Sequence, residues 1–271
     1  MKQVKFLMLA LVILMGVGFT SCMNGDDDTT VRQDAFVKVH TSTFGSTYFV
    51  DANGFKYYPS ATSMATMKST YGFDPSSGDM AYIIYQYDSA TQTVTENTES
   101  LKDLQLMYAM GLDATVESVS EEGASNDSIA KAPIRSLDGT IGSFYKYEPF
   151  MFDESTLLLQ IDYFMGVDGL LSHYFTLVHY PNEPAEENTI KLYLRHNNGK
   201  DTSTNYTSVN FSGQYPFVFY KAFNLSKLNV TPIDTDTKII IETQVNNTNI
   251  DLEDKNNTSS KTYEVQIKAK E

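Results

Sequence analysis

The segment "TYEVQIKAK", residues 262–270, decides the fold class, because apolar and polar side chains alternate along it. The apolar positions are Tyr263, Val265, Ile267 and Ala269. Successive side chains of a β-strand point to opposite faces, so this period of two predicts a strand with one face on a core and one in water. A less regular alternation through residues 157–163 and 190–196 predicts two further strands.

Turn dipeptides separate several apolar runs. They are Asn53-Gly54, Asp168-Gly169 and Asn198-Gly199. Asn-Gly and Asp-Gly accept the positive backbone angle φ of a tight turn, so the first two predict β-hairpins. Helical signal is scarce: "TESLKDLQLMYAM", residues 98–110, is the best candidate for a short helix and could equally lead into a strand. The chain contains 18 Tyr and 16 Phe, and aromatic residues favour strands. We therefore predict an all-β protein.

The best boundary between domains is the polar, unpatterned stretch at residues 121–133. It predicts one domain over residues 35–120 and a second over residues 134–271. A chain of this length buries enough surface for two domains, and with a single cysteine it has no internal disulfide to rely on.

The N-terminus has the features of a secretory signal peptide. Lys2 and Lys5 precede an apolar run from Phe6 to Phe19, which is shorter than the roughly 20 residues that span a bilayer. The segment "FTSC", residues 19–22, resembles the lipobox of bacterial lipoproteins. We therefore expect residues 1–21 to be removed and Cys22 to carry the lipid; the alternative is a free cysteine in a discarded signal peptide.

Residues 22–34 lack apolar periodicity, which predicts an acidic tether. Asp26, Asp27 and Asp28 in it resemble the export signal that sends some Gram-negative lipoproteins to the outer face of the outer membrane. The alternative is a solvated tether alone. With the lipid on Cys22 and this export signal, the chain is expected on the outer membrane, facing the cell exterior. The net charge of −14 and the lack of a cluster of Lys and Arg exclude a nucleic-acid partner.

The histidines do not indicate a catalytic or metal site. His173 and His179 share a predicted strand but lie roughly 20 Å apart at ~3.3 Å per residue, too far to chelate one metal. His40 and His196 fit core or turn positions better than a ligand or base. The chain has no G-x-S-x-G motif. We expect no catalytic residues, no metal and no cofactor.

Two serines are candidate O-glycosylation sites. Ser89 in Asp88-Ser89-Ala90 and Ser128 in Asp127-Ser128-Ile129 resemble the three-residue acceptor of exported proteins in the same bacterial lineage. The alternative is that both are ordinary loop residues.

The lipobox with its aspartates and three strand segments together resemble the NigD-like family of outer-membrane lipoproteins. The segments are "LLLQIDYF", "HYFTLVHY" and "IKLYLRHNNGKD", and the most specific motif is Leu194, Arg195, His196 and Asn197, whose role is unknown. The resemblance implies an OB-like β-barrel domain followed by an immunoglobulin-like β-sandwich domain. It brings no catalytic residues.

These observations predict a surface-exposed, non-enzymatic envelope protein that binds a protein or glycan partner. A bacteriocin immunity-type protein and a hydrolase with an unrecognised site remain alternatives. Large rings alternate on both faces of "QYPFVFYKAF", residues 214–223, so at least one face must be covered. We expect this cover to be a protein core rather than a binding partner.

Overall fold

A computed structural model describes residues 29–43, 45–120, 130–141, 145–166, 172–199, 201, 206–209, 219–228 and 237–265. The chain forms two compact units, Met1–Leu112 and Asp113–Glu271. Both are built from strands, so the all-β prediction is confirmed.

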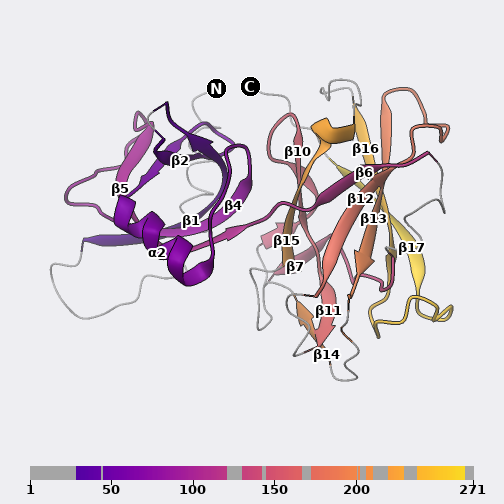
Figure 1. The fold of residues 1–271 in the computed structure, drawn as a ribbon. Helices are drawn as coiled ribbons and strands as arrows, with labels where there is room; N and C mark the ends of the chain where they lie inside the picture. Colours follow the sequence, from indigo (N-terminus) through magenta and orange to yellow (C-terminus); the bar gives the residue numbers. More distant parts are fainter. Residues whose placement is uncertain are drawn as a thin grey trace. The chain divides into compact units, whose positions relative to one another are not determined.

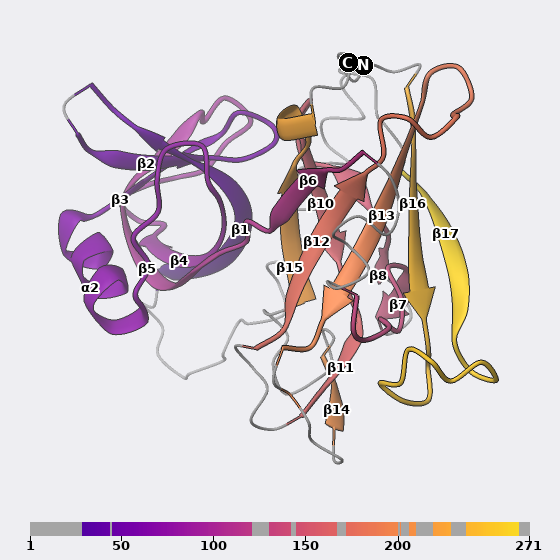
Figure 2. The same ribbon diagram turned by 45° about the vertical axis from the view of Figure 1, so that its right-hand side comes forward.

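The first unit is a closed five-stranded barrel with the strand order β1-β2-β3-β5-β4, and Figures 1 and 2 show its strands closing into a ring. Neighbouring strands are antiparallel except β3 and β5, which run parallel. Val37 and Val39 of β1 face the core, where they meet Phe49 and Tyr57. The bounds are β1 Thr30–Thr41, β2 Thr47–Val50, β3 Lys56–Pro59, β4 Met80–Asp88 and β5 Ser100–Gly111.

Helix α2, Ala61–Tyr71, connects β3 to β4. Ser60 caps its N-terminus, because the Ser60 hydroxyl oxygen accepts the backbone N–H of Ser63 at 3.1 Å. Gly72 ends it with a φ of 67°. The sequence did not predict this helix, because it is rich in Ser and Thr, which favour caps and turns over helix interiors.

Of the two interpretations of residues 98–110, the short helix is wrong and the strand is confirmed, because Ser100–Gly111 forms strand β5. The buried residues of β5 are Leu101, Leu104, Leu106 and Ala109, and their spacing departs from the period of two expected of a strand. The departure arises because β5 shifts register against both β3 and β4. Each bulge inserts a residue and breaks the period of two.

A five-stranded sheet with the order β17-β16-β13-β12-β6 is the largest sheet described in the second unit. Two of its strand pairs, β13–β16 and β12–β6, are parallel. Its strands are β6 Thr115–Ser118, β12 Tyr174–His179, β13 Thr189–Asn197, β16 Lys238–Val245 and β17 Ser259–Val265.

Smaller sheets and one short helix complete the described part of this unit. A three-stranded sheet has the order β15-β10-β9, and β11 pairs with β14 and β7 with β8. The bounds are β7 Gly139–Ile141, β8 Tyr145–Tyr147, β9 Phe150–Met151, β10 Thr156–Gln160, β11 Tyr163–Gly166, β14 Tyr206–Val209, β15 Tyr220–Asn224 and the 3₁₀-helix η3 Leu225–Leu228.

Two of the three strands expected from alternation are confirmed where the structure describes them. Tyr263 and Val265 of β17 are buried while Glu264 between them is exposed, and residues 190–196 lie in β13. The single strand expected over residues 157–163 is wrong, because β10 ends at Gln160 and Tyr163 begins β11 in another sheet. Residues 266–270 of the alternating stretch lie outside the described residues.

The hairpin at Asn53-Gly54 is confirmed. It joins β2 to antiparallel β3, and Gly54 adopts a φ of 84°. The hairpin expected around residues 168–169 is wrong in its pairing. Although that turn lies outside the described residues, β11 pairs with β14, and β12 pairs with β13 and β6. A turn dipeptide permits a reversal, but packing of the strands selects their partners.

Both expected domain limits differ from the structure. Strand β1 begins at Thr30 and pairs with β4, so residues 30–34 of the expected tether belong to the barrel. The second unit begins at Asp113, ahead of the expected linker at 121–133, because β6 pairs with β12. Ala132 of that linker forms a bridge with His196, and Ile134 just after it forms one with Val245. Long-range pairing of this kind leaves no local pattern in the sequence.

The aromatic segment at residues 214–223 is covered where it is described. Phe219, Tyr220 and Phe223 are each less than 7% exposed, and β15 pairs with β10. The described rings therefore belong to a core, as expected.

Candidate functional site

Most of the expected modification sites lie outside the described residues, namely Cys22, Asp26, Asp27, Asp28 and Ser128. Ser89 is described and follows β4 directly. Its hydroxyl donates a hydrogen bond to the carbonyl oxygen of Thr29 at 2.8 Å. A sugar on Ser89 would remove this donor, so glycosylation there stays a prediction.

The motif Leu194, Arg195, His196 and Asn197 lies on β13, and all four side chains are buried. The Arg195 guanidinium lies 4.9 Å from the centre of the Tyr193 ring. The Asn197 side-chain oxygen accepts the backbone N–H of Gly199 at 2.7 Å, which supports the turn after β13. The motif therefore belongs to the interior of the second unit.

His196 is part of a hydrogen-bonded chain of side chains that the sequence did not predict. His173 Nδ1 lies 2.9 Å from His196 Nε2, and His173 Nε2 lies 2.8 Å from Asp201 Oδ2. At the other end, His196 Nδ1 lies 3.0 Å from the carbonyl oxygen of Pro133. All four ring nitrogens of the two histidines therefore have partners within the protein.

The partners assign the protons of this chain. A carbonyl oxygen only accepts, so His196 donates from Nδ1 to Pro133 and accepts at Nε2 the proton of His173 Nδ1. His173 Nε2 then faces Asp201 Oδ2 at 2.8 Å, a hydrogen bond that requires a proton on one of these two groups.

Aromatic rings enclose the two histidines. The Phe175 ring stacks on His196 at a centroid distance of 4.6 Å, and the Tyr163 ring lies 5.3 Å from both imidazoles. Burial lowers the pKa of His196 to about 3. Burial also lowers the pKa of His173, although Asp201 opposes this shift.

This arrangement does not provide a free general base or metal ligand, because each imidazole nitrogen is already hydrogen-bonded. Among the described residues, no group of three His, Cys, Asp or Glu side chains could hold a metal ion. The sequence favoured a core-edge or turn-supporting position for His196 over a ligand or base, but it did not indicate the partners of this buried ring. His173, His196 and Asp201 come from separate segments, and no local pattern links them.

The other two histidines have different surroundings. His40 on β1 stacks on Tyr48 of β2 at 5.3 Å, and Tyr48 stacks on Tyr58 of β3 at 5.4 Å, which gives a row of rings across three strands. Among the described residues, His179 Nδ1 has no hydrogen-bond partner. Neither histidine lies in a group that suggests catalysis.

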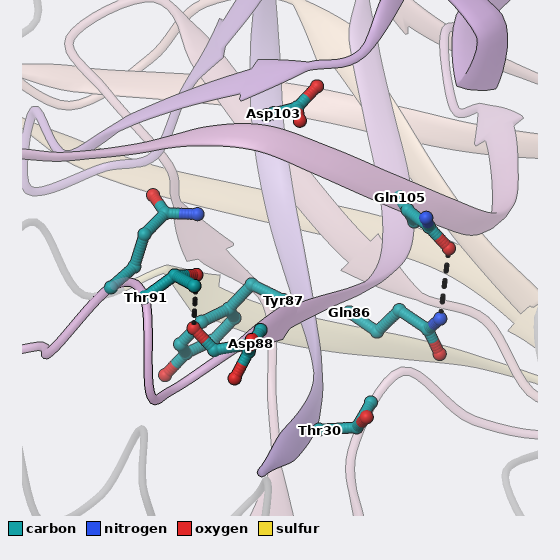
Figure 3. Close-up of a pocket in the computed structure, with 8 residues that line it drawn as sticks. Thr30, Gln86, Tyr87, Asp88, Thr91, Asp103 and Gln105 are labelled. Carbon is teal, nitrogen blue, oxygen red and sulfur yellow. Dashed lines mark hydrogen bonds between the residues drawn. The ribbon is translucent and has the colours of Figure 1, made fainter.

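A surface pocket of about 260 Å³ lies on the barrel, at the start of β1, the end of β4 and the first part of β5 (Figure 3). Every lining residue carries a polar group. They are Thr30, Gln86, Tyr87, Asp88, Thr91, Gln92, Asp103 and Gln105. The described lining includes two carboxylates and no Lys, Arg or His. Its electrostatic character is therefore negative.

Part of this lining is held in place by hydrogen bonds. Asp88 Oδ1 accepts from the Thr29 hydroxyl and from the backbone N–H of Ala90. Gln92 donates to the carbonyl oxygen of Lys102 at 2.7 Å and accepts the Lys102 N–H at 2.8 Å, which joins the β4–β5 loop to β5. The walls of the pocket are thus anchored before any ligand arrives.

Other polar groups of the pocket have remaining capacity. Gln105 accepts from the Gln86 amide at 3.1 Å, as Figure 3 shows, and no hydrogen bond from its own amide nitrogen is found in the described part of the chain. The Asp103 carboxylate likewise has no hydrogen-bond partner there. Asp103 also has a φ of 52°, an uncommon value for a residue other than glycine. It lies where β5 shifts register against β3.

No family model and no curated protein matches the chain. The chain is, however, similar to several solved structures. The chain is 28% identical to a Bacteroides fragilis protein described as "Putative lipoprotein", with a TM-score of 0.65 over 89% of this chain and 99% of the other. It is 13% identical to a Bacteroides vulgatus protein of unknown function, with a TM-score of 0.53 over 88% and 92%.

A third match is a NigD-like immunity protein from Bacteroides caccae. It has 14% identity and a TM-score of 0.48 over 85% of this chain and 91% of the other. The likeness to lipoproteins that the sequence indicates is confirmed by the first match. The second likeness concerns the fold alone. No described helix is both long and apolar enough to cross a membrane.

Proposed function

We propose that this protein is a lipid-anchored envelope protein that binds a partner and performs no chemistry. The observation that carries the proposal is its similarity, over nearly the full length of both chains, to the Bacteroides fragilis protein described as "Putative lipoprotein". The segment "FTSC" supports it, because it offers Cys22 as the site of the lipid. An acylated cysteine anchors a protein stably when two or more acyl chains are attached.

The aspartates that follow Cys22 support a position on the outer membrane, facing the exterior. Asp26, Asp27 and Asp28 resemble an export signal, and a segment this acidic is repelled by anionic lipid. In this proposal the lipid alone holds the protein to the membrane, and the β-units extend from it into the medium.

The binding role is supported by both units. In the second unit, the buried histidines have every ring nitrogen occupied, which disfavours a hydrolase built on them. In the first, the barrel carries an anchored polar pocket. A partner, protein or glycan, would meet this surface without any group arranged as nucleophile and base.

We also propose finer fold assignments. The order β1-β2-β3-β5-β4 with α2 between β3 and β4 supports an OB-like barrel, a fold that often hosts binding sites. The five-stranded and three-stranded sheets of the second unit support an immunoglobulin-like sandwich, although its two parallel strand pairs differ from a wholly antiparallel arrangement.

Substitution Cys22→Ala tests the anchor. The variant is expected to lose incorporation of a fatty-acid probe and to leave the membrane fraction, either as an uncut precursor or as a soluble released protein. Met23→Ala is the matched control and should label and fractionate as the parent does. Continued labelling of Cys22→Ala would contradict the proposal, since the chain has no other cysteine.

A further inference from the structure

The pocket on the barrel contains hydrogen-bond donors and acceptors that no described residue satisfies. The acceptors are the Asp103 carboxylate and Asp88 Oδ2. The hydrogen bonds from the Thr29 hydroxyl and the Ala90 N–H both go to Asp88 Oδ1 and leave Oδ2 available. The donor is the amide nitrogen of Gln105. The Thr91 hydroxyl donates to the Asp88 carbonyl oxygen at 3.0 Å and retains its capacity to accept.

This mixture restricts the chemistry of a ligand. An anion would meet the Asp88 and Asp103 carboxylates, while no cation lines the pocket and the Arg32 guanidinium beside it donates to Gln86 Oε1 at 3.2 Å. A metal cation would suit the carboxylates, but among the described residues no group of three His, Cys, Asp or Glu side chains could hold one. A hydroxyl group both donates and accepts, so adjacent hydroxyls on one ring can satisfy the carboxylates and the amide together.

The size and the remaining lining agree with such a ligand. The volume of about 260 Å³ is below the range of drug-sized pockets, roughly 300 to 1,000 Å³, and suits a single sugar ring or the end of a longer chain. Tyr87 is the one aromatic residue of the lining. It packs against the barrel core beside Tyr85, with 6.4 Å between ring centres, so its ring is held in place.

We infer that this pocket binds a neutral saccharide, with Asp103 and Gln105 as its principal hydrogen-bonding residues. The inference rests on the proposed binding role and names the ligand class. Asp103 would accept from ligand hydroxyls, and Gln105 would donate to them. Asp103 lines the pocket at the bulge in β5, where it has a φ of 52°.

Saturation-transfer NMR on the full chain in deuterated detergent micelles tests the inference. The probes are the methyl glycosides of glucose, galactose, mannose and N-acetylglucosamine, with glucuronic acid and calcium chloride as charged comparators. At least one neutral glycoside is expected to bind. Asp103→Gly and Gln105→Ala should each weaken its affinity by roughly tenfold or more, because each removes a direct polar contact.

The control is Asn188→Gly. Asn188 and Asp103 are the two described residues other than glycine with positive φ, and Asn188 does not line the pocket. Glycine accepts both backbone conformations, so both variants should fold. Asn188→Gly should bind the glycoside as the parent does.

Three outcomes would overturn the inference. They are binding of none of the neutral glycosides, binding of glucuronic acid or calcium in their place, and parental affinity in both Asp103→Gly and Gln105→Ala. None of these affects the lipid anchor, because Cys22→Ala reports on labelling and fractionation alone. Conversely, a chain that binds a glycoside but takes up no fatty acid would end the anchor proposal and leave the pocket intact.

Discussion

His196 contacts only other protein groups, and its titration therefore affects stability. Burial holds its pKa at about 3 in the folded chain, while an exposed histidine titrates near 6.5. The pKa of His173 is also lowered. Below pH 6.5 the unfolded chain binds more protons than the folded one at these rings. The contribution of these two histidines to the free energy of unfolding is therefore present above pH 6.5 and is lost as the pH falls.

We expect the free energy of unfolding to be about 1 to 2 kcal/mol lower at pH 5 than at pH 7 from the buried histidines. Urea denaturation at the two pH values measures it. His196→Asn retains a donor for the Pro133 carbonyl but not the titrating ring, so it should be less stable at pH 7 and show a smaller difference between pH 7 and pH 5.

His40→Gln is the control for this measurement, because His40 lies in a partly exposed row of rings on the barrel. It should keep the full difference. An unchanged difference in His196→Asn would show that other groups cause the loss of stability in acid.

At the scale of elements, α2 depends on its two ends more than on an apolar face. Ser63 and Met67 are its buried side chains. Gly72 ends the helix with a φ of 67°, and its backbone N–H reaches the carbonyl oxygens of Lys68 and Met67. No atom lies within 4 Å of the position where a Cβ would stand, so any cost of a side chain at Gly72 comes from backbone conformation alone.

Gly72→Ala is therefore expected to lower the free energy of unfolding by about 1 kcal/mol, the cost of a left-handed conformation for an L-residue. Gly72→Asn should cost less, because Asn tolerates this conformation. Chemical denaturation of the three proteins checks the order. Equal stability of the alanine and asparagine variants would contradict this account.

At the scale of the whole molecule, negative charge is abundant and its position near the anchor matters. The net charge is −14, and three successive aspartates follow Cys22 closely. Exposed acidic side chains also occur far along the chain, as at Glu96, Glu186 and Glu187. Total charge and position can therefore be separated by mutation.

Replacing Asp26, Asp27 and Asp28 with alanine should leave lipid attachment intact but reduce digestion by protease added to whole cells, because fewer molecules would reach the exterior. Replacing Glu96, Glu186 and Glu187 with alanine changes the net charge equally and should not affect digestion. If the aspartate variant is digested as readily as the parent, those residues form a tether without a role in export.

Several strands and one turn of the fold can be predicted from the sequence. The alternation around Tyr263 and Val265, the reversal at Asn53-Gly54 and the buried rings of residues 219–223 all follow from neighbours in the chain, since strand geometry and turn angles are local properties. The candidate helix at 98–110 was wrong because bulges in β5 disturb the same local period. The pocket includes Asp103 at one of these bulges and brings β1, β4 and β5 together, which no local pattern predicts.

The sequence by itself determined the all-β class, the positions of several strands and the expectation of a lipid anchor at Cys22. Only the tertiary structure decided that β6 joins β12, that His173, His196 and Asp201 form one chain of hydrogen bonds, and that β1, β4 and β5 share a polar pocket. The reason is physical. A period of two is encoded by adjacent residues, whereas strand partners and side-chain clusters are selected by packing between segments far apart in the chain.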